Sequence, residues 1–207
     1  MNTGYYPIPA APARATIVVR GSRFIAQAIP TPTIAAARAA IAAARAEMPD
    51  ATHHCYAYLI GYGASTVAGM SDDGEPAGTA GRPIMAVLRG TGLGDITIIV
   101  TRYFGGTLLG VGGLVRAYSD AARAVLATTP RAKRMIYQRM TLRLTYADYA
   151  IVRHLLEIET AEILAEDFAD TIAITVDVPA DRAADLNQRI SDRSAGRVQI
   201  ELITNMV

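Results

Sequence analysis

Three carboxylates stand within four positions of one polar segment, residues 71–83. The charges of Asp72, Asp73 and Glu75 repel one another unless something compensates them. A divalent cation such as Mg²⁺ would do so, because it takes oxygen ligands. Arginine pairing would also serve, as would a turn in which aspartate bonds nearby backbone amides. Since the spacing matches no established metal motif, we expect no metal and no other cofactor, with Mg²⁺ as the alternative.

A glycine-rich segment, residues 101–118, follows a β-branched run and leads into a helical pattern. Glycines let a backbone approach a ligand closely, and the free amides of a first helical turn attract anions. Arg102 could add a charged fork for phosphate, although the segment is neither a Walker A nor a dinucleotide motif. The alternative is tight strand-to-helix packing. Tyr103, Phe104 and Tyr118 could stack on bases, but core packing is the favoured interpretation for all three.

Two histidines and the single thiol of the chain are consecutive, at His53, His54 and Cys55. On a strand the two imidazoles point to opposite faces, and the third histidine, His154, belongs to the other half of the chain. A zinc site is therefore not favoured, and neither is a cysteine nucleophile, because no third group to orient a Cys–His pair is evident. A lone cysteine also excludes an internal disulfide and fits a reducing cytoplasm.

The strands and helices that would position these residues are predicted in the first part of the chain. Strands are predicted at 15–19 and 22–28 around a turn at Gly21, and Thr33 is predicted to cap a helix whose apolar positions recur from Ile34 to Met48. Further predictions are a strand at 55–60, a long loop at 62–80, a short helix at 83–88, a buried strand at 95–101 and a helix ending near Ala127.

The second half has a cleaner pattern. Strands are predicted around Met140–Leu144, at 163–168, at 172–178 with strict period two, and around Val198–Leu202. One helix is predicted to begin after Asp148, which would cap it, and a second helix is predicted at 181–190. The order βαββαβ is that of a ferredoxin-like sandwich. The junction between two domains, 1–133 and 138–207, is expected near Pro130 to Gln138.

The charged residues are also distributed unevenly between the two parts of the chain. Residues 1–137 carry thirteen Lys and Arg against seven Asp and Glu, whereas the remainder carries seven against twelve. A basic first part would favour phosphate, although ordinary surface scatter is an equal alternative. No run of about 18 apolar residues and no signal-peptide pattern is evident, so we expect a soluble, cytoplasmic protein without a membrane partner.

Four stretches together carry a family resemblance. They are Ser22-Arg23-Phe24-Ile25-Ala26, Cys55-Tyr56-Ala57-Tyr58, the segment 71–83 and the segment 101–120, and they resemble the YigZ/Impact family. The resemblance implies an α+β protein. Its first domain would have the ribosomal protein S5 domain 2-like fold, a sheet with helices on one side. Its second domain would resemble the ferredoxin-like last domain of elongation factor G.

The resemblance also implies function. The family's eukaryotic members regulate translation through protein partners, and nucleic-acid binding has been suggested for bacterial members. We therefore expect a protein that binds RNA or the ribosome. The alternatives are a metal-dependent phosphoryl-transfer or hydrolytic enzyme using the acidic segment, and a protein-interaction module. By position, the family's signature segments correspond here to the acidic residues Asp72, Asp73 and Glu75, and to the phosphate-binding candidates Arg82, Arg102, Gly105, Gly106, Gly110, Gly112, Gly113 and Arg116. Leu108 and His54 depart from the family's usual polar residue and asparagine.

Overall fold

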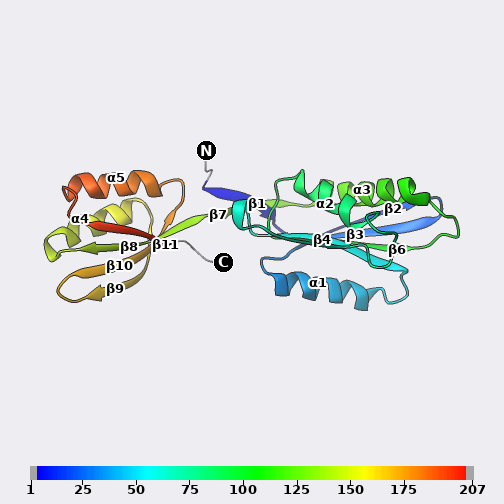
Figure 1. Cartoon of the computed structure of the whole chain (residues 1–207), viewed down its shortest axis with the longest axis horizontal. Helices are drawn as coiled ribbons and strands as arrows, with labels where there is room; N and C mark the ends of the chain where they lie inside the picture. Colours follow the sequence, from blue (N-terminus) through cyan, green and yellow to red (C-terminus); the bar gives the residue numbers. More distant parts are fainter. Residues whose placement is uncertain (1–3, 204–207) are drawn as a thin grey trace. The chain divides into compact units, whose positions relative to one another are not determined.

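The computed structural model describes residues 4–203, which form two compact units. One unit spans Tyr6–Lys133, and the other contains residues 134–203 together with 4–5. The chain therefore passes from the first unit to the second between Lys133 and Arg134. Both units combine helices with antiparallel sheet (Figure 1).

The first unit is built on a five-stranded sheet of order β2-β3-β6-β4-β5. Every neighbouring pair is antiparallel. β6 is central and almost completely buried, and the six residues before Arg102 are all β-branched. The strands are β2 (Ala13–Val19), β3 (Ser22–Pro30), β4 (His53–Ile60), β5 (Val67–Ser71) and β6 (Ile96–Tyr103).

Helices cover both faces of this sheet (Figure 1). The helices α2 (Gly81–Arg89) and α3 (Gly110–Thr128) pack on the face that carries Ile98 and Val100. The helix α1 (Ile34–Glu47) packs on Ile99, which points the other way. The expectation of helices on one side only was therefore wrong, because β6 is apolar on both faces and each face needs a cover.

The second unit is a four-stranded antiparallel sheet of order β11-β8-β10-β9. Its elements, in the predicted order βαββαβ, are β8 (Tyr137–Leu144), α4 (Tyr146–Ile158), β9 (Glu162–Phe168), β10 (Ile172–Pro179), α5 (Ala183–Arg193) and β11 (Gln199–Ile203). The alternation along β10 is confirmed, with Ile172, Ile174, Val176 and Val178 fully buried. The predicted cap at Asp148 was wrong. The helix begins earlier, after Thr145, and Asp148 is instead buried and paired with Arg197 at 2.6 Å.

Three short strands were not predicted. β1 (Tyr5–Pro9) pairs with β7 (Arg131–Met135) in a two-stranded sheet. The expected loop at 62–80 also contains the edge strand β5, preceded by a 3₁₀ turn, η1 (Gly63–Ser65). Glycine at position 69 of β5 had hidden its strand character, but this glycine faces the Tyr58 ring, where a side chain would collide.

The helix that Thr33 caps is confirmed, with Thr33 Oγ1 accepting the Ala36 N–H.

In the part of the chain that the structure describes, no helix is both long and apolar enough to cross a membrane.

Candidate functional site

The acidic segment is a tight turn that is held by its own carboxylates. Asp73 and Gly74 both have positive φ, at 42° and 86°, so the chain reverses sharply after β5. Asp72 then accepts three backbone N–H groups, from Gly78, Ala80 and Gly81, at 2.8–2.9 Å. These last two amides belong to the start of α2. Asp72 therefore positions that helix, as the turn interpretation predicted.

The same contacts determine the protonation of Asp72. Desolvation alone would raise its pKa, but the hydrogen bonds from the Gly78, Gly81 and Ala80 amides outweigh burial, and Arg82 adds a favourable charge. The pKa of Asp72 is consequently lower than its ordinary value. Arg82 thus lies near the acidic turn, exposed on α2.

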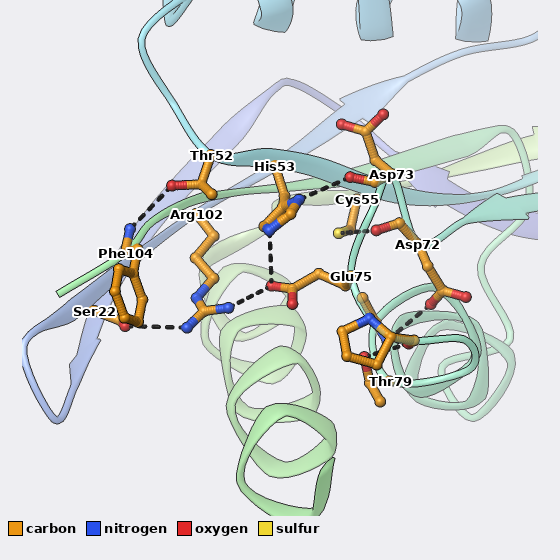
Figure 2. Close-up of polar contacts among 12 residues, drawn as sticks. Ser22, Thr52, His53, Cys55, Asp72, Asp73, Glu75, Thr79, Arg102 and Phe104 are labelled. Atoms are coloured by element: carbon orange, nitrogen blue, oxygen red, sulfur yellow. Dashed lines mark hydrogen bonds and ion pairs between the residues drawn. The ribbon is translucent and has the colours of Figure 1, made fainter. Parts of the chain in front are cut away.

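Asp73 ties the turn to two other elements. Its Oδ2 accepts the backbone N–H of His54 at 2.7 Å, and its Oδ1 lies 2.5 Å from Arg45 on α1. Its own carbonyl oxygen lies 2.8 Å from His53 Nδ1. The carboxylate of Asp73 is therefore occupied by β4 and α1, on the side away from Glu75 (Figure 2).

Glu75 is buried at the centre of a polar network (Figure 2). Its Oε1 accepts hydrogen bonds from Arg102 Nη1 and from Tyr118 Oη, each at 2.7 Å. Arg102, at the end of β6, is also buried, and its Nη2 donates to Ser22 Oγ at 3.3 Å. The guanidinium that was expected to contact phosphate is therefore paired with an acid inside the protein.

Burial also makes the neighbouring groups unreactive. Desolvation raises the pKa of Cys55 to about 12, against the smaller effect of its hydrogen bond to Tyr118. Desolvation likewise raises the pKa of Tyr118 far above its ordinary value, reinforced by Cys55 and Glu75. A thiol with so high a pKa is protonated at neutral pH, so Cys55 is not a nucleophile here.

The two histidines face opposite sides of the sheet, as predicted. His54 is buried on the α1 side, with Nδ1 3.0 Å from Thr101 Oγ1. Desolvation, the largest influence, lowers the pKa of His54. His53 is on the other side, where its Nε2 lies 3.9 Å from Glu75 Oε1.

The three carboxylates do not converge. Each has its own partners, and Figure 2 shows them pointing in different directions. Among residues 4–203 no group of three or more His, Cys, Asp or Glu side chains is arranged to hold a metal ion. The donor arrangement thus does not fit the catalytic Mg²⁺ hypothesis.

An open groove of about 480 Å³ lies above the Glu75–Arg102 pair. We call it the apolar groove. Its floor is formed by His53, Glu75 and Arg102, and its walls by Pro76, Phe104, Leu108, Leu109, Val111 and Leu114. Several wall residues are strongly exposed, Leu108 at 83% and Phe104 at 47%. The core position favoured for Phe104 was therefore wrong, whereas Tyr118 is fully buried as expected.

A second groove, of about 350 Å³, lies beside the start of α3. This basic groove is lined by Arg20, Leu109, Gly112, Gly113, Arg116 and Asp120, among others. Asp120 pairs with Arg123 at 2.7 Å, whereas no ion pair or hydrogen bond between described residues engages the guanidinium of Arg20 or Arg116. Leu109 lines both grooves. Arg20 was not predicted, although its place beside the Gly21 turn could have suggested a residue presented at the end of the sheet.

The glycines of the segment serve two different purposes. A Cβ on Gly105 would lie 1.9 Å from the carbonyl carbon of Gly21, so this glycine permits backbone packing. Gly106 and Gly110 have positive φ, at 83° and 71°, and open space around them. Gly112 has neither constraint, since nothing lies within 4 Å of the site of its missing Cβ. Gly113 is tight only against Leu109.

The predicted phosphate-binding residues are thus distributed over several places. Gly112, Gly113 and Arg116 line the basic groove, and Gly110 and Arg102 line the apolar groove. Gly105 and Gly106 belong to the connection between β6 and α3, and Arg82 lines neither groove.

Comparisons with known proteins agree with this architecture. The family model for the Impact N-terminal domain matches residues 20–126, and a model described as a domain of unknown function (DUF1949) matches residues 142–197. The chain is 39% identical over 194 residues to IMPACT family member YigZ of Escherichia coli, covering 93% of this chain and 95% of the relative. It is 36% identical to an IMPACT family member of Haemophilus influenzae, covering 89% and 90%.

A crystal structure described as that of a hypothetical protein has a TM-score of 0.74 and 37% identity to this chain. The match covers 98% of this chain and 99% of that one. Domain models on both units, together with relatives matched over nearly their whole length, show that this chain belongs to the IMPACT family.

Proposed function

We propose that this protein binds single-stranded RNA along the start of α3. The single observation that carries the proposal is the pairing of two grooves around Leu109, one with the unpaired cations Arg20 and Arg116 and one with the exposed ring of Phe104. Proteins that bind single-stranded nucleic acid combine positive charge along the backbone with aromatic rings for the bases.

The start of α3 supports a role in phosphate binding. No side chain caps this helix, and its first turn contains no acidic residue. Its positive end is therefore open to an anion. Gly112 and Gly113, in that first turn, leave its backbone uncovered on the side of Arg20 and Arg116. We therefore assign the proposed phosphate contacts to Arg20 and Arg116 rather than to Arg102, which is buried.

The proposal also includes the kind of RNA that is bound, the cellular role and the fold of each unit. The RNA would include that of the ribosome, in a cytoplasmic protein that regulates translation, as the family resemblance implies. The strand order of the second unit supports a ferredoxin-like fold, and the five-stranded antiparallel sheet of the first supports a variant of the S5 domain 2-like fold with a helix on its second face.

A salt titration tests the proposal. Fluorescence anisotropy of a labelled single-stranded RNA, measured between about 50 and 200 mM salt, should show affinity falling steeply with salt. The double variant Arg20→Ala/Arg116→Ala should reduce the slope of log affinity against log salt by about 1.4, which corresponds to two lost phosphate contacts on a single strand.

The matched control is Arg38→Ala/Arg89→Ala. It removes the same charge from exposed helical arginines, on α1 and α2, that line neither groove. The proposal fails if both double variants change the slope equally, or if the protein captures only protein partners that persist after nuclease treatment.

A further inference from the structure

Strand β5 forms an open edge of the five-stranded sheet. It pairs with β4 on one side, from Val67 to Ser71, and no strand within residues 4–203 pairs with its other side. An edge strand presents a row of backbone N–H and C=O groups that can pair with another chain. β5 contains no charged residue and no proline, and its register with β4 has no bulge. The edge therefore lacks the features that usually discourage the addition of a further strand.

The exposed side chains of β5 are apolar. Val67 is 42% exposed and Met70 is 48% exposed. Ala68 lies opposite Leu59 of β4, which belongs to the core that α2 covers (Figure 1). Since side chains alternate between the two faces of a strand, Ala68 and Met70 both point to the α2 side of the sheet. A strand added to this edge would therefore meet apolar side chains on that side.

A pocket of about 330 Å³ lies between the start of β5 and the end of α2. We call it the edge pocket. Leu59, Ala68 and Leu93 form its apolar wall, and Thr66 and Arg89 also line it. No residue that lines it belongs to the lining of the apolar groove or the basic groove. The edge pocket is thus separate from both grooves near α3, and it adjoins only the N-terminal part of β5.

Arg89 gives the edge pocket its charge. It is exposed at the last position of α2, and within residues 4–203 its guanidinium has no ion-pair or hydrogen-bond partner. No acidic side chain lines the pocket. A guanidinium without an acid beside it attracts a carboxylate, with which it can form two parallel hydrogen bonds. The pocket therefore combines an apolar wall with a cation that is available to an anionic ligand.

The loop that leads into β5 is held in place beside the pocket. The ring of Tyr62, which lines the pocket, stacks on Tyr6 with the ring centroids 5.0 Å apart. Tyr6 Oη donates to Asp95 Oδ2 at 2.7 Å, and the backbone N–H of Gly61 donates to Asp95 Oδ1 at 2.8 Å. A loop that is already fixed lowers the entropic cost of binding a ligand.

We propose that β5 and the edge pocket bind the C-terminal end of an extended peptide from a partner protein, with a branched aliphatic last residue. The peptide adds a strand antiparallel to β5, so that its C-terminus reaches the start of β5, where the pocket lies. Its carboxylate pairs with Arg89, and its last side chain contacts Leu59 and Leu93. A parallel peptide would bring an amino terminus to Arg89, so charge selects the antiparallel direction.

The first test uses a library of short random peptides with free carboxyl termini, attached to beads by their N-terminal ends. The protein should enrich valine, isoleucine or leucine at the last position. The most enriched peptide is then labelled with fluorescein at its N-terminus, and anisotropy compares its affinity with that of its C-terminal amide. The amide should bind about tenfold more weakly, because the charge-assisted hydrogen bonds to Arg89 are lost.

The matched protein variants are Arg89→Gln and Arg82→Gln, at exposed positions near opposite ends of α2. Arg89→Gln should weaken binding of the free peptide about tenfold but change binding of the amide little. Arg82 does not line the edge pocket, so Arg82→Gln should leave both affinities close to those of the original protein. Because both positions are exposed, both variants should keep the original thermal midpoint.

Strand addition has a readout of its own. Hydrogen exchange followed by NMR should show that backbone amides of Val67–Ser71 gain protection when the peptide binds, because outward-facing N–H groups become hydrogen-bonded. Amides at the start of α3 should exchange as before. The double variant Arg20→Ala/Arg116→Ala, designed to impair RNA binding, should bind the peptide as the original protein does.

Three results would overturn the inference. The carboxylate site is rejected if no peptide is enriched, or if the amide binds as well as the free peptide. Peptide binding without added protection in β5 rejects strand addition. Loss of peptide binding in Arg20→Ala/Arg116→Ala places the peptide in the basic groove instead. RNA binding does not enter this inference, so failure of the peptide experiments with salt-dependent RNA binding intact leaves the proposed function standing.

Discussion

Glu75 Oε1 and Arg102 Nη1 lie 2.7 Å apart, and both side chains are at least 94% buried. The two residues come from a turn and from the central strand β6, twenty-seven positions apart in the sequence. Their pairing resolves the charge conflict of the acidic segment from inside the protein. It also forms the floor of the apolar groove, so fold stability and the proposed binding site depend on the same contact.

Replacing Arg102 should therefore destabilise the fold. In Arg102→Ala, Glu75 is left buried without its cation, and the free energy of unfolding should fall by about 3–5 kcal/mol. Urea denaturation followed by circular dichroism measures the change. Arg123→Ala is the control, because it breaks an exposed ion pair with Asp120 that is worth about 0.5 kcal/mol or less. Similar costs for the two variants would contradict a structural role for the buried pair.

Asp72 should stabilise the protein in a pH-dependent way. Since its pKa is lower in the folded protein, its contribution is complete above the pKa of the unfolded chain, about 4, and is lost as pH falls through the lower folded value. Asp72→Asn should cost about 1–3 kcal/mol at neutral pH.

The difference between Asp72→Asn and the original protein should shrink below about pH 4. Urea unfolding at several pH values measures it, and Asp120→Asn, at a surface site, should show a much smaller effect. A cost for Asp72→Asn that stays constant down to the lowest pH at which the protein folds would contradict the assignment.

Two glycines should respond oppositely to alanine. Gly105→Ala places a methyl group against the Gly21 backbone and should destabilise the fold by at least about 3 kcal/mol. Gly112→Ala meets open space inside a helix and should stabilise the fold by about 0.5–1 kcal/mol. Because Gly112 lines the basic groove, the same variant should weaken RNA binding. Improved stability with unchanged RNA affinity would remove Gly112 from the proposed interface.

Cys55 should resist thiol reagents in the folded protein. It is buried and its pKa is raised to about 12, so a colorimetric thiol reagent at pH 8 should label the protein only after denaturant is added. Rapid labelling of the native protein would show that the structure around Cys55 opens readily.

Periodicity predicted most of the fold because most elements bury one apolar face. The alternation in β10 and the Thr33 cap are examples in which local chemistry and final structure agree. β1, β5 and β7 were missed because each has only five residues. β1 and β7 become strands by pairing with each other although they are far apart in the sequence, and Gly69 interrupts the strand pattern of β5.

The site was harder to predict than the fold. The sequence identified Glu75 and Arg102 as unusual, but it could not show that they neutralise each other, since the contact depends on how the turn folds back over β6. Core packing was the favoured interpretation for Phe104, yet this residue lies just beyond the end of β6, where the sheet no longer covers it. Arg20 belongs to no recognisable motif, so the sequence did not identify it as a candidate.

The floor of the apolar groove and the polar network beneath it are assembled from Ser22, His53, Glu75, Arg102 and Tyr118, which are spread over nearly a hundred positions of the chain. During synthesis, a nascent chain that ends before α3 lacks both the Tyr118 hydroxyl and one wall of the groove. Under the proposed function, ligand recognition by this unit would therefore be acquired late in translation, only after α3 has left the ribosomal exit tunnel.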